Sequence, residues 1–410
     1  MAEEGRVLVR LQEHESKPVT LDRATARALK LRFGNKYLDI QEDLTREGSN
    51  TYVLTAHQYV GTIELDGLRI VIAPKAPTNN LFYMLTYAYD LPEFREEHSE
   101  IDESEELFEF IVEIFAGQVE RLAQQGIFRS YVARQENKPF LRGRLQMAQQ
   151  VRRDAVQPGR FWQESADYTA DVIENRILKW TLWHLSRAEY RKPQLRPRLR
   201  RALTLFSEVS LTPIAEADFD RIVYNRLNRS YQSRINLARL LLQHRSVEGK
   251  EGAVAFAAYL FDMNKAFELF VAHYLAAHFA ASREPDQAID VVIQKEIWLD
   301  ASERERVRPD IVLRRDGRPY LVLDTKHKKL QGPPDEGDRR EMLEYCNTLR
   351  LRLGVLIYSD GSAKVNHYPY SGEMVWALRT EVLALTGSLP EFRARCQAFA
   401  ERFAQTVAHG

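Results

Sequence analysis

The segment YLVLDTKHKK, residues 320–329, runs three aliphatic residues directly into an acid, a threonine and a lysine. A short apolar run of this kind is typical of a buried strand. Side chains two apart in a strand point to the same face, so Asp324 and Lys326 share a face with Val322. The segment therefore predicts a buried strand that carries a carboxylate and an ammonium group side by side.

A second carboxylate comes from the preceding segment VRPDIVL, which contains Asp310 and is joined to the first by RRDGRP. A two-residue turn at Asp316-Gly317 would pair Asp310 with Leu323 and leave the two aspartates on opposite faces. A three-residue loop, with Gly317 left-handed beside a bulge, pairs Asp310 with Val322 and brings both carboxylates to one face. A functional role for the pair therefore requires the bulge.

Two carboxylates beside a lysine suit a hard divalent cation that also accepts phosphate oxygens and water. We expect Mg²⁺ or Mn²⁺ to be held by Asp310, Asp324 and the backbone carbonyl of Thr325. Lys326 would orient or help to deprotonate the attacking water and balance charge during phosphodiester hydrolysis. Glu268, at the edge of the apolar stripe of a long helix, is a candidate further ligand, although an ordinary boundary glutamate explains it equally well.

These residues also have a purely structural explanation, because an aspartate followed later by Asp-x-Lys occurs by chance in many chains. Charged residues at the ends of strands are often simply solvated. The combination of Pro309-Asp310 in an apolar segment, a turn, the lysine-bearing strand and a following helix favours the nuclease interpretation. His327 and Lys328 could contact a phosphate backbone, but a solvated strand exit explains both as well.

The composition limits the class of protein. A chain of 410 residues is long enough for two or three domains, and 44% hydrophobic with 28% charged residues describes a packed, soluble protein. Its 58 basic and 58 acidic residues cancel, so attraction for nucleic acid must come from local patches. Two cysteines, Cys346 and Cys396, provide no disulfide framework or zinc site. The sequence shows no signal-type start or membrane-length apolar stretch, so we expect a cytoplasmic protein.

The pattern along the chain predicts an α+β protein of several domains: a small β-rich domain over 1–95, a mainly helical middle domain over 96–248, and an α/β core over 249–410. In the first, VGTIEL and LRIVIAP form a hairpin around Asp66-Gly67, and a helix capped by Asn80 follows. The second contains ELFEFIVEIFAGQVERLAQQG, which ends at Gly126 as a helix C-cap.

The third domain follows a polar stretch, 246–253, which is typical of a linker. We expect a long helix over 253–281, then short strands that include the two segments described above. A helix over about 338–352, strands at LGVLIYS and MVWALR, and a last helix from about 389 complete it.

The middle domain carries two basic stretches. The first contains Arg134, Lys138, Arg142, Arg144, Arg152 and Arg153, and the second contains Arg187, Arg191, Lys192, Arg196, Arg198, Arg200 and Arg201. Solvated helix faces produce such runs routinely, and contact with phosphates is the competing explanation. Arg142 and Arg144 are candidate DNA contacts.

The C-terminal segments resemble the PD-(D/E)xK nuclease superfamily. The residues that fall on its motif are Pro309, Asp310, Asp324, Thr325 and Lys326. The superfamily often has a helix with an Asp-x-x-Gln-Met-x-x-Tyr pattern after the lysine strand. Here DRREMLEY supplies Asp338, Met342 and Tyr345, and Tyr345 becomes a candidate DNA contact, but Glu341 stands where glutamine is commoner. The resemblance implies a restriction-endonuclease-like core.

Most of the chain resembles the McrC family, the nuclease subunit of McrBC-type 5-methylcytosine-specific restriction systems. Segments in the family's order include VGTIELDGLRIVIAPKAPTNNLFYMLTYA, ENKPFLRGRL, DVIENRILKWTLWHL, YNRLNRSYQSRINLARLLL and LFDMNKAFELFV. The resemblance implies an amino-terminal part that engages the pore region of a hexameric, McrB-like AAA+ partner and stimulates its hydrolysis of GTP. The partner would recognise the methylated double-stranded DNA that the subunit cleaves in phage defence.

Two other functions remain open. The chain could be an interaction protein that mainly activates a partner NTPase, with a weak nuclease. It could also be a free-standing DNA repair nuclease whose basic helical region grips DNA directly, in which case DNA binding would depend steeply on salt.

Overall fold

The computed structural model describes residues 7–43, 50–65, 67–91, 107–153, 159–188, 190–243, 245–251, 254–281, 289–293, 297–298, 306–361, 366–370 and 376–408. The chain forms two compact units, one of residues 1–108 with 244–410 and one of residues 109–243. The predicted boundary between residues 95 and 96 lies outside the described residues. Within these ranges no helix combines the length and the apolar character that a membrane crossing requires.

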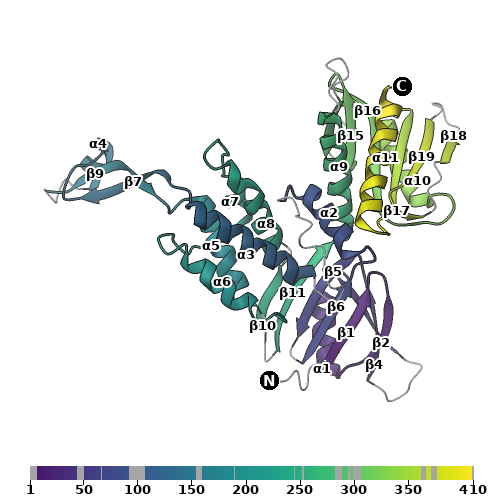
Figure 1. Ribbon diagram of the computed structural model, residues 1–410, viewed down its shortest axis with the longest axis horizontal. Coiled ribbons are helices and arrows are strands. Elements are labelled where there is room, and N and C mark those ends of the chain that lie inside the picture. Colours follow the sequence, from purple (N-terminus) through teal and green to yellow (C-terminus); the bar gives the residue numbers. More distant parts are fainter. Residues whose placement is uncertain are drawn as a thin grey trace. The chain divides into compact units, whose positions relative to one another are not determined.

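The larger unit begins with a five-stranded sheet in the order β1-β6-β5-β11-β10 (Figure 1). Its strands are β1 (Val7–Gln12), β5 (Tyr59–Leu65), β6 (Leu68–Ala73), β10 (Arg245–Glu251) and β11 (Val254–Asp262). Only the β1–β6 pair is parallel. The predicted hairpin is confirmed, because Leu65 pairs with Leu68 and Gly67 has a φ of +75°, while Asp66 lies outside the described residues.

Strands β10 and β11 correct two predictions. The polar stretch predicted as a linker forms the edge strand β10 (Arg245–Glu251), and residues 252 and 253 lie outside the described residues. The apolar residues of β11 pair with β5, so the long helix begins only at Met263 as α9 (Met263–Ala281). A continuous apolar run fits a buried strand and a buried helix equally well.

A small sheet in the order β2-β4-β3 packs beside the first sheet and shares its core. Its strands are β2 (Ser16–Thr20), β3 (Leu38–Glu42) and β4 (Thr51–Ala56). The helix α1 (Arg23–Phe33), which the sequence reading missed, contributes Leu29 and Phe33 to that core. Asp22 caps α1 by accepting hydrogen bonds from the backbone N–H groups of Ala24 and Thr25.

Helix α2 (Thr78–Ala88) follows β6, but Asn80 does not cap it. The helix begins after Pro77, and the fully buried Asn80 side chain donates hydrogen bonds to the carbonyl oxygens of Leu385 (2.8 Å) and Gly387 (2.9 Å). Asn80 therefore ties the N-terminal region to the loop that precedes the last helix.

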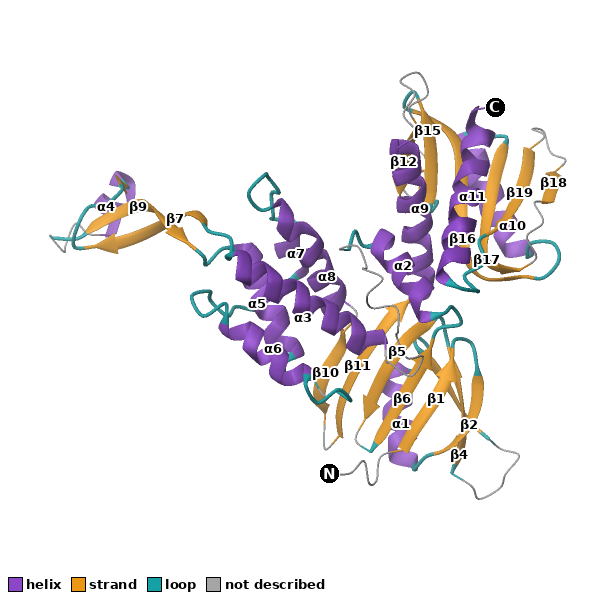
Figure 2. Ribbon diagram, in the orientation of Figure 1, coloured by secondary structure: helices purple, strands orange, loops and turns teal. Residues whose placement is uncertain are grey.

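The C-terminal part is a mixed six-stranded sheet in the order β12-β15-β16-β17-β19-β18. Its strands are β12 (Ile289–Ile293), β15 (Ile311–Arg315), β16 (Arg318–Leu330), β17 (Leu353–Gly361), β18 (Asn366–Tyr370) and β19 (Trp376–Val382), with a separate pair β13 (Ile297–Trp298) and β14 (Arg306–Val307). Helices α9 and α11 (Leu389–Ala408) cover one face, and α10 (Glu336–Leu349) packs on the other (Figure 2). The predicted helices and strands are found here in the predicted order, but strand β18 was not predicted and the long helix begins later than predicted.

The smaller unit combines helices with a sheet that the sequence reading missed. The helices are α3 (Leu107–Gln125), α4 (Met147–Arg153), α5 (Ile173–Leu185), α6 (Leu195–Thr204), α7 (Glu216–Phe219), α8 (Gln232–Gln243) and the 3-10 helix η2 (Arg229–Tyr231). Helix α3 ends as predicted before Gly126, whose φ is +102°. The strands β7 (Ser130–Lys138), β8 (Arg144–Leu145) and β9 (Phe161–Thr169) form an antiparallel sheet, so much of the first basic stretch lies on strands.

Candidate active site

The hairpin of β15 and β16 contains the expected bulge in an unexpected place. Its turn has two residues, Asp316 and Gly317, with φ values of +51° and +74°. Arg315 pairs with Arg318, but the register shifts by one residue beyond Arg314, so that Ile311 pairs with Leu323. The predicted three-residue loop and the pairing of Asp310 with Val322 are therefore wrong.

Continuing this register brings Asp310 opposite Asp324, so the bulge places both aspartates on one side of the hairpin. Asp310 lies in the bend just before β15. Its Oδ2 atom accepts hydrogen bonds from the backbone N–H (2.8 Å) and the hydroxyl (2.7 Å) of Thr325. These two bonds hold the carboxylate against β16.

Asp324 and Lys326 form an ion pair on the same face of β16. The Nζ atom of Lys326 lies 2.7 Å from Oδ2 of Asp324, which is only 3% exposed. The contact is not aligned as a hydrogen bond, so this buried oxygen is without a hydrogen-bond donor among the described residues. Such an oxygen still has capacity to accept a ligand.

Helix α10 adds a third acid, whose role the sequence left in doubt. Glu341 accepts a hydrogen bond from Nζ of Lys326 through Oε2 (2.8 Å) and from the hydroxyl of Tyr345 through Oε1 (2.8 Å). The Tyr345 ring is buried in the core between α10 and the sheet. Tyr345 therefore positions Glu341, and its contact with DNA stays a prediction.

The charges around Lys326 keep it protonated. Burial lowers the pKa of the lysine, but the carboxylates of Asp324 and Glu341 outweigh burial and the pKa is raised. Burial, followed by the charge of Asp310, raises the pKa of Asp324. A cationic Lys326 is suited to stabilising negative charge and orienting water rather than to accepting a proton.

Glu268 reaches the same region from α9, on the other side of the sheet from α10. It is 8% exposed, and the Nζ atom of Lys265 lies 3.2 Å from its Oε1 atom. Burial first, and then the negative charge of Asp310, raises the pKa of Glu268 to about 7. A carboxylate with this environment gains from a nearby cation.

The residue types at this site suit a divalent cation, but their side chains are not arranged as a metal-binding group. Asp310, Asp324 and Glu268 supply oxygen ligands, and their charges act on one another. Among the described residues, however, no three His, Cys, Asp or Glu side chains already stand as a metal-binding group. In this arrangement the hydroxyl of Thr325 is bonded to Oδ2 of Asp310, and the ammonium group of Lys326 lies 2.7 Å from Oδ2 of Asp324.

The predicted DNA contacts are spread over the molecule. His327 is buried and its Nε2 atom lies 2.9 Å from Oε1 of Glu13, while Lys328 is half-exposed and pairs with Asp335 and Asp338. Arg142 and Arg144 are exposed residues of the smaller unit. Their contact with DNA stays a prediction.

Comparisons with known proteins agree on one family. Residues 54–359 match the family model of the McrBC 5-methylcytosine restriction system component. The chain is 23% identical over 274 residues to the type IV methyl-directed restriction enzyme EcoKMcrBC of Escherichia coli K12, covering 62% of this chain and 74% of that protein.

A solved structure shows a similar fold, and a second one gives a weaker match. A chain of the half-complex of Thermococcus gammatolerans McrB AAA+ hexamers with bound McrC has a TM-score of 0.58 at 20% identity, over 96% of this chain and all of that one. A chain of the cryo-EM structure of the McrBC complex from the same organism has a TM-score of 0.44 at 23% identity, over 68% of this chain and 90% of that one.

Proposed function

Because the chain belongs to the McrC family of McrBC 5-methylcytosine restriction system components, we propose that it is a metal-dependent endodeoxyribonuclease subunit that hydrolyses DNA phosphodiester bonds. The observation that carries the proposal is the convergence of Asp310, Asp324 and Lys326 at the hairpin of β15 and β16. The six-stranded sheet with helices on both faces is then a PD-(D/E)xK-type core, whose motif residues these are.

Asp310, Asp324, Glu268 and the backbone carbonyl of Thr325 would hold Mg²⁺ or Mn²⁺. The cation, when bound, supplies Lewis-acid stabilisation of the phosphate oxygens and activates water. Lys326 has a second partner in Glu341, so it would stay bonded to that residue if a cation took its place beside Asp324. Lys326 then presents its positive charge to the scissile phosphate, where negative charge develops.

We propose that the subunit works in the cytoplasm with a hexameric, McrB-like AAA+ GTPase, whose nucleotide hydrolysis it stimulates. The related McrC chain bound to McrB AAA+ hexamers supports this assignment. The partner would recognise the methylated DNA. Arg142, Arg144 and Lys328, which are exposed or half-exposed, remain candidates for contacts with the DNA backbone.

The test is metal-dependent cleavage of methylated DNA by the complex of this chain with its AAA+ partner and nucleotide. Asp310→Asn, Asp324→Asn and Lys326→Ala should each lower the cleavage rate by at least about a hundredfold, since each removes a charge from the site. Asp290→Asn is the matched control, because Asp290 is an exposed acid on β12 of the same sheet. Cleavage by Asp324→Asn at the wild-type rate would refute the assignment.

A further inference from the structure

The catalytic strand β16 is irregular directly after Lys326. Lys326 pairs with Tyr358 of β17, but the next pair joins Lys329 to Asp360, so β16 has one extra residue at positions 327 and 328. A bulge of this kind bends its strand and re-aims neighbouring side chains. The direction of the Lys326 side chain therefore depends on whatever fixes this bulge.

The bulge is fixed from the N-terminal region by Glu13. The His327 side chain is 7% exposed, and its Nε2 atom lies 2.9 Å from Oε1 of Glu13, 314 residues away in the chain. Nδ1 of His327 is buried without a hydrogen-bond partner among the described residues. Among the described residues, the polar part of the ring is therefore anchored by Glu13.

Glu13 is itself rigidly held. It lies in the turn between β1 and β2, and its side chain is fully buried. Its Oε2 atom accepts a hydrogen bond from the backbone N–H of Lys75 (3.0 Å), and its own N–H donates to the carbonyl oxygen of Ala73 (3.1 Å). The next residue, His14, has a φ of +56°, so the turn is tight.

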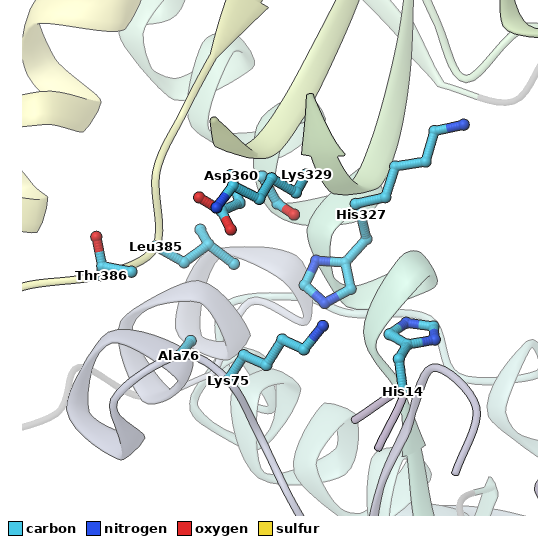
Figure 3. Close-up of a pocket in the computed structure, with 10 residues that line it drawn as sticks. His14, Lys75, Ala76, His327, Lys329, Asp360, Leu385 and Thr386 are labelled. Carbon is cyan, nitrogen blue, oxygen red and sulfur yellow. The ribbon is translucent and has the colours of Figure 1, made fainter. Parts of the chain in front are cut away.

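Figure 3 shows the surroundings of His327 and of His14, the residue after Glu13. His327, His14 and Lys75 point toward one another around a cavity of about 230 Å³. The ring of His327 also lies 5.9 Å from that of Phe267 on α9, measured between centroids. The ring therefore lies close to both the N-terminal turn and the helix that carries Glu268.

We infer that Glu13 is a positioning residue for the nuclease reaction: through His327 it sets the bulge that aims Lys326. The N-terminal region is thereby a structural part of the active site rather than only a separate module. The effect of Glu13 on cleavage rests on the proposed function, whereas the effect of Glu13 on the bulge does not.

The test compares full-length variants in two measurements. The first is cleavage of methylated DNA with the AAA+ partner, GTP and Mg²⁺, expressed per nucleotide hydrolysed so that changes in partner engagement cancel. The second is amide hydrogen exchange of residues 326–330 in the chain alone. Glu13→Ala should lower kcat roughly ten- to hundredfold with little change in KM for DNA, because misplacing a catalytic group costs rate rather than binding. Exchange at 326–330 should become faster.

Glu13→Gln should recover both measurements only in part, because its single amide oxygen can accept from either His327 or the backbone N–H of Lys75 but not from both. Asn80→Ala is the control: it removes another buried hydrogen bond between the N-terminal region and the C-terminal part without touching β16. If Glu13→Ala does not fold, His327→Ala should show the same losses and His327→Gln should recover them.

Two results would overturn the inference: equal loss of kcat in Asn80→Ala and Glu13→Ala, or unchanged exchange at residues 326–330 in Glu13→Ala. Failure of the wild-type complex to cleave DNA would refute the proposed function instead. The exchange of residues 326–330 would still decide the role of Glu13.

Discussion

Lys326 lies between two carboxylates that belong to different elements, Asp324 on its own strand and Glu341 on α10. The two contacts have different consequences. Asp324 is buried, whereas the Glu341 side chain is 44% exposed, so the second contact is the more strongly screened by solvent. The positive charge of Lys326 is therefore balanced mainly by Asp324, while Glu341 adds a hydrogen bond at the exposed side.

The different exposure of the two carboxylates predicts a small effect of Glu341→Gln. The amide oxygen still accepts a hydrogen bond from Lys326, so cleavage should fall by less than about tenfold, which corresponds to about 1.4 kcal/mol. Glu341→Ala removes the acceptor and should reduce cleavage further. The measurement is the single-turnover cleavage rate of the complex, with Glu344→Gln, an exposed glutamate on the same helix, as the control. A complete loss of cleavage in Glu341→Gln would show that the charge of Glu341 is needed.

At the scale of elements, the position of α10 depends on Gly354 of β17. A Cβ atom there would collide with the side chain of Met342 and lie 2.9 Å from Sγ of Cys346, both of which are buried. The absence of a side chain therefore allows α10 to approach the sheet closely enough for Glu341 to reach Lys326.

Gly354→Ala should lower the free energy of unfolding by about 1–3 kcal/mol, as overpacking of a core does. It should also slow cleavage, because α10 moves away from β16. The double variant with Met342→Ala should be more stable than the sum of the two single effects predicts, since both changes share one space. Gly337→Ala on α10 is the control, because a Cβ there meets nothing within 4 Å. Additive effects in the double variant would contradict the steric explanation.

In the smaller unit, Asp171 fixes the start of α5. It accepts hydrogen bonds from Nε and Nη2 of Arg176 (2.7 and 2.8 Å) and from the N–H and hydroxyl of Ser210 (2.9 and 2.7 Å). The hydrogen bonds from Arg176 are the main cause of a lowered pKa for Asp171, against the opposing effect of burial. The contact joins α5 to the loop after α6.

Asp171→Asn should destabilise this unit at pH 7 by about 1.5–3 kcal/mol, the range for hydrogen bonds to a charged group. Because the folded-state pKa is lowered, the stabilisation is complete above the unfolded value of 3.8 and is lost as the pH falls below it. The difference between variant and wild type should therefore shrink below about pH 4. Denaturant unfolding followed by tryptophan fluorescence measures it, since Trp180 and Trp183 lie on α5.

The control for Asp171→Asn is Asp167→Asn, whose partner Arg142 is largely exposed. A pair of that kind contributes about 0.2–1 kcal/mol. A destabilisation by Asp171→Asn that does not change between pH 7 and pH 3 would mean that the effect is steric and not electrostatic.

The sequence predicted the elements whose signals are local and failed where pairing is distant. The hairpin at Gly67 and the strand that carries Asp324 follow from alternation and turn residues within a few positions. Strand β10 is polar because it is an edge strand, and it resembled a linker. The apolar strand β11 pairs with β5, which lies about half the chain away, and no local pattern reveals this pairing.

The contacts of the candidate site likewise include local ones, which the sequence could predict, and distant ones, which it could not. Asp310, Asp324 and Lys326 are adjacent in a hairpin, so their meeting could be predicted, although not the position of the bulge. The contact of Glu341 with Lys326 needed the packing of α10, and the contact of Glu13 with His327 joins opposite ends of the chain. His327 is also buried beside this distant residue, whereas its position at the end of an apolar run suggested a solvated side chain.

At the scale of the whole molecule, cleavage and activation of the partner should be separable. Asp324 is 3% exposed within the core of the larger unit, so its replacement changes no surface that a partner could contact. Asp324→Asn should therefore lose cleavage and still stimulate the partner's nucleotide hydrolysis to within about twofold of the wild type, as expected for independent sites. The measurement is GTP hydrolysis by the partner at saturating concentrations of this chain, with the partner alone as the baseline. Stimulation that falls in parallel with cleavage would contradict separability and show that the nuclease centre itself controls nucleotide turnover.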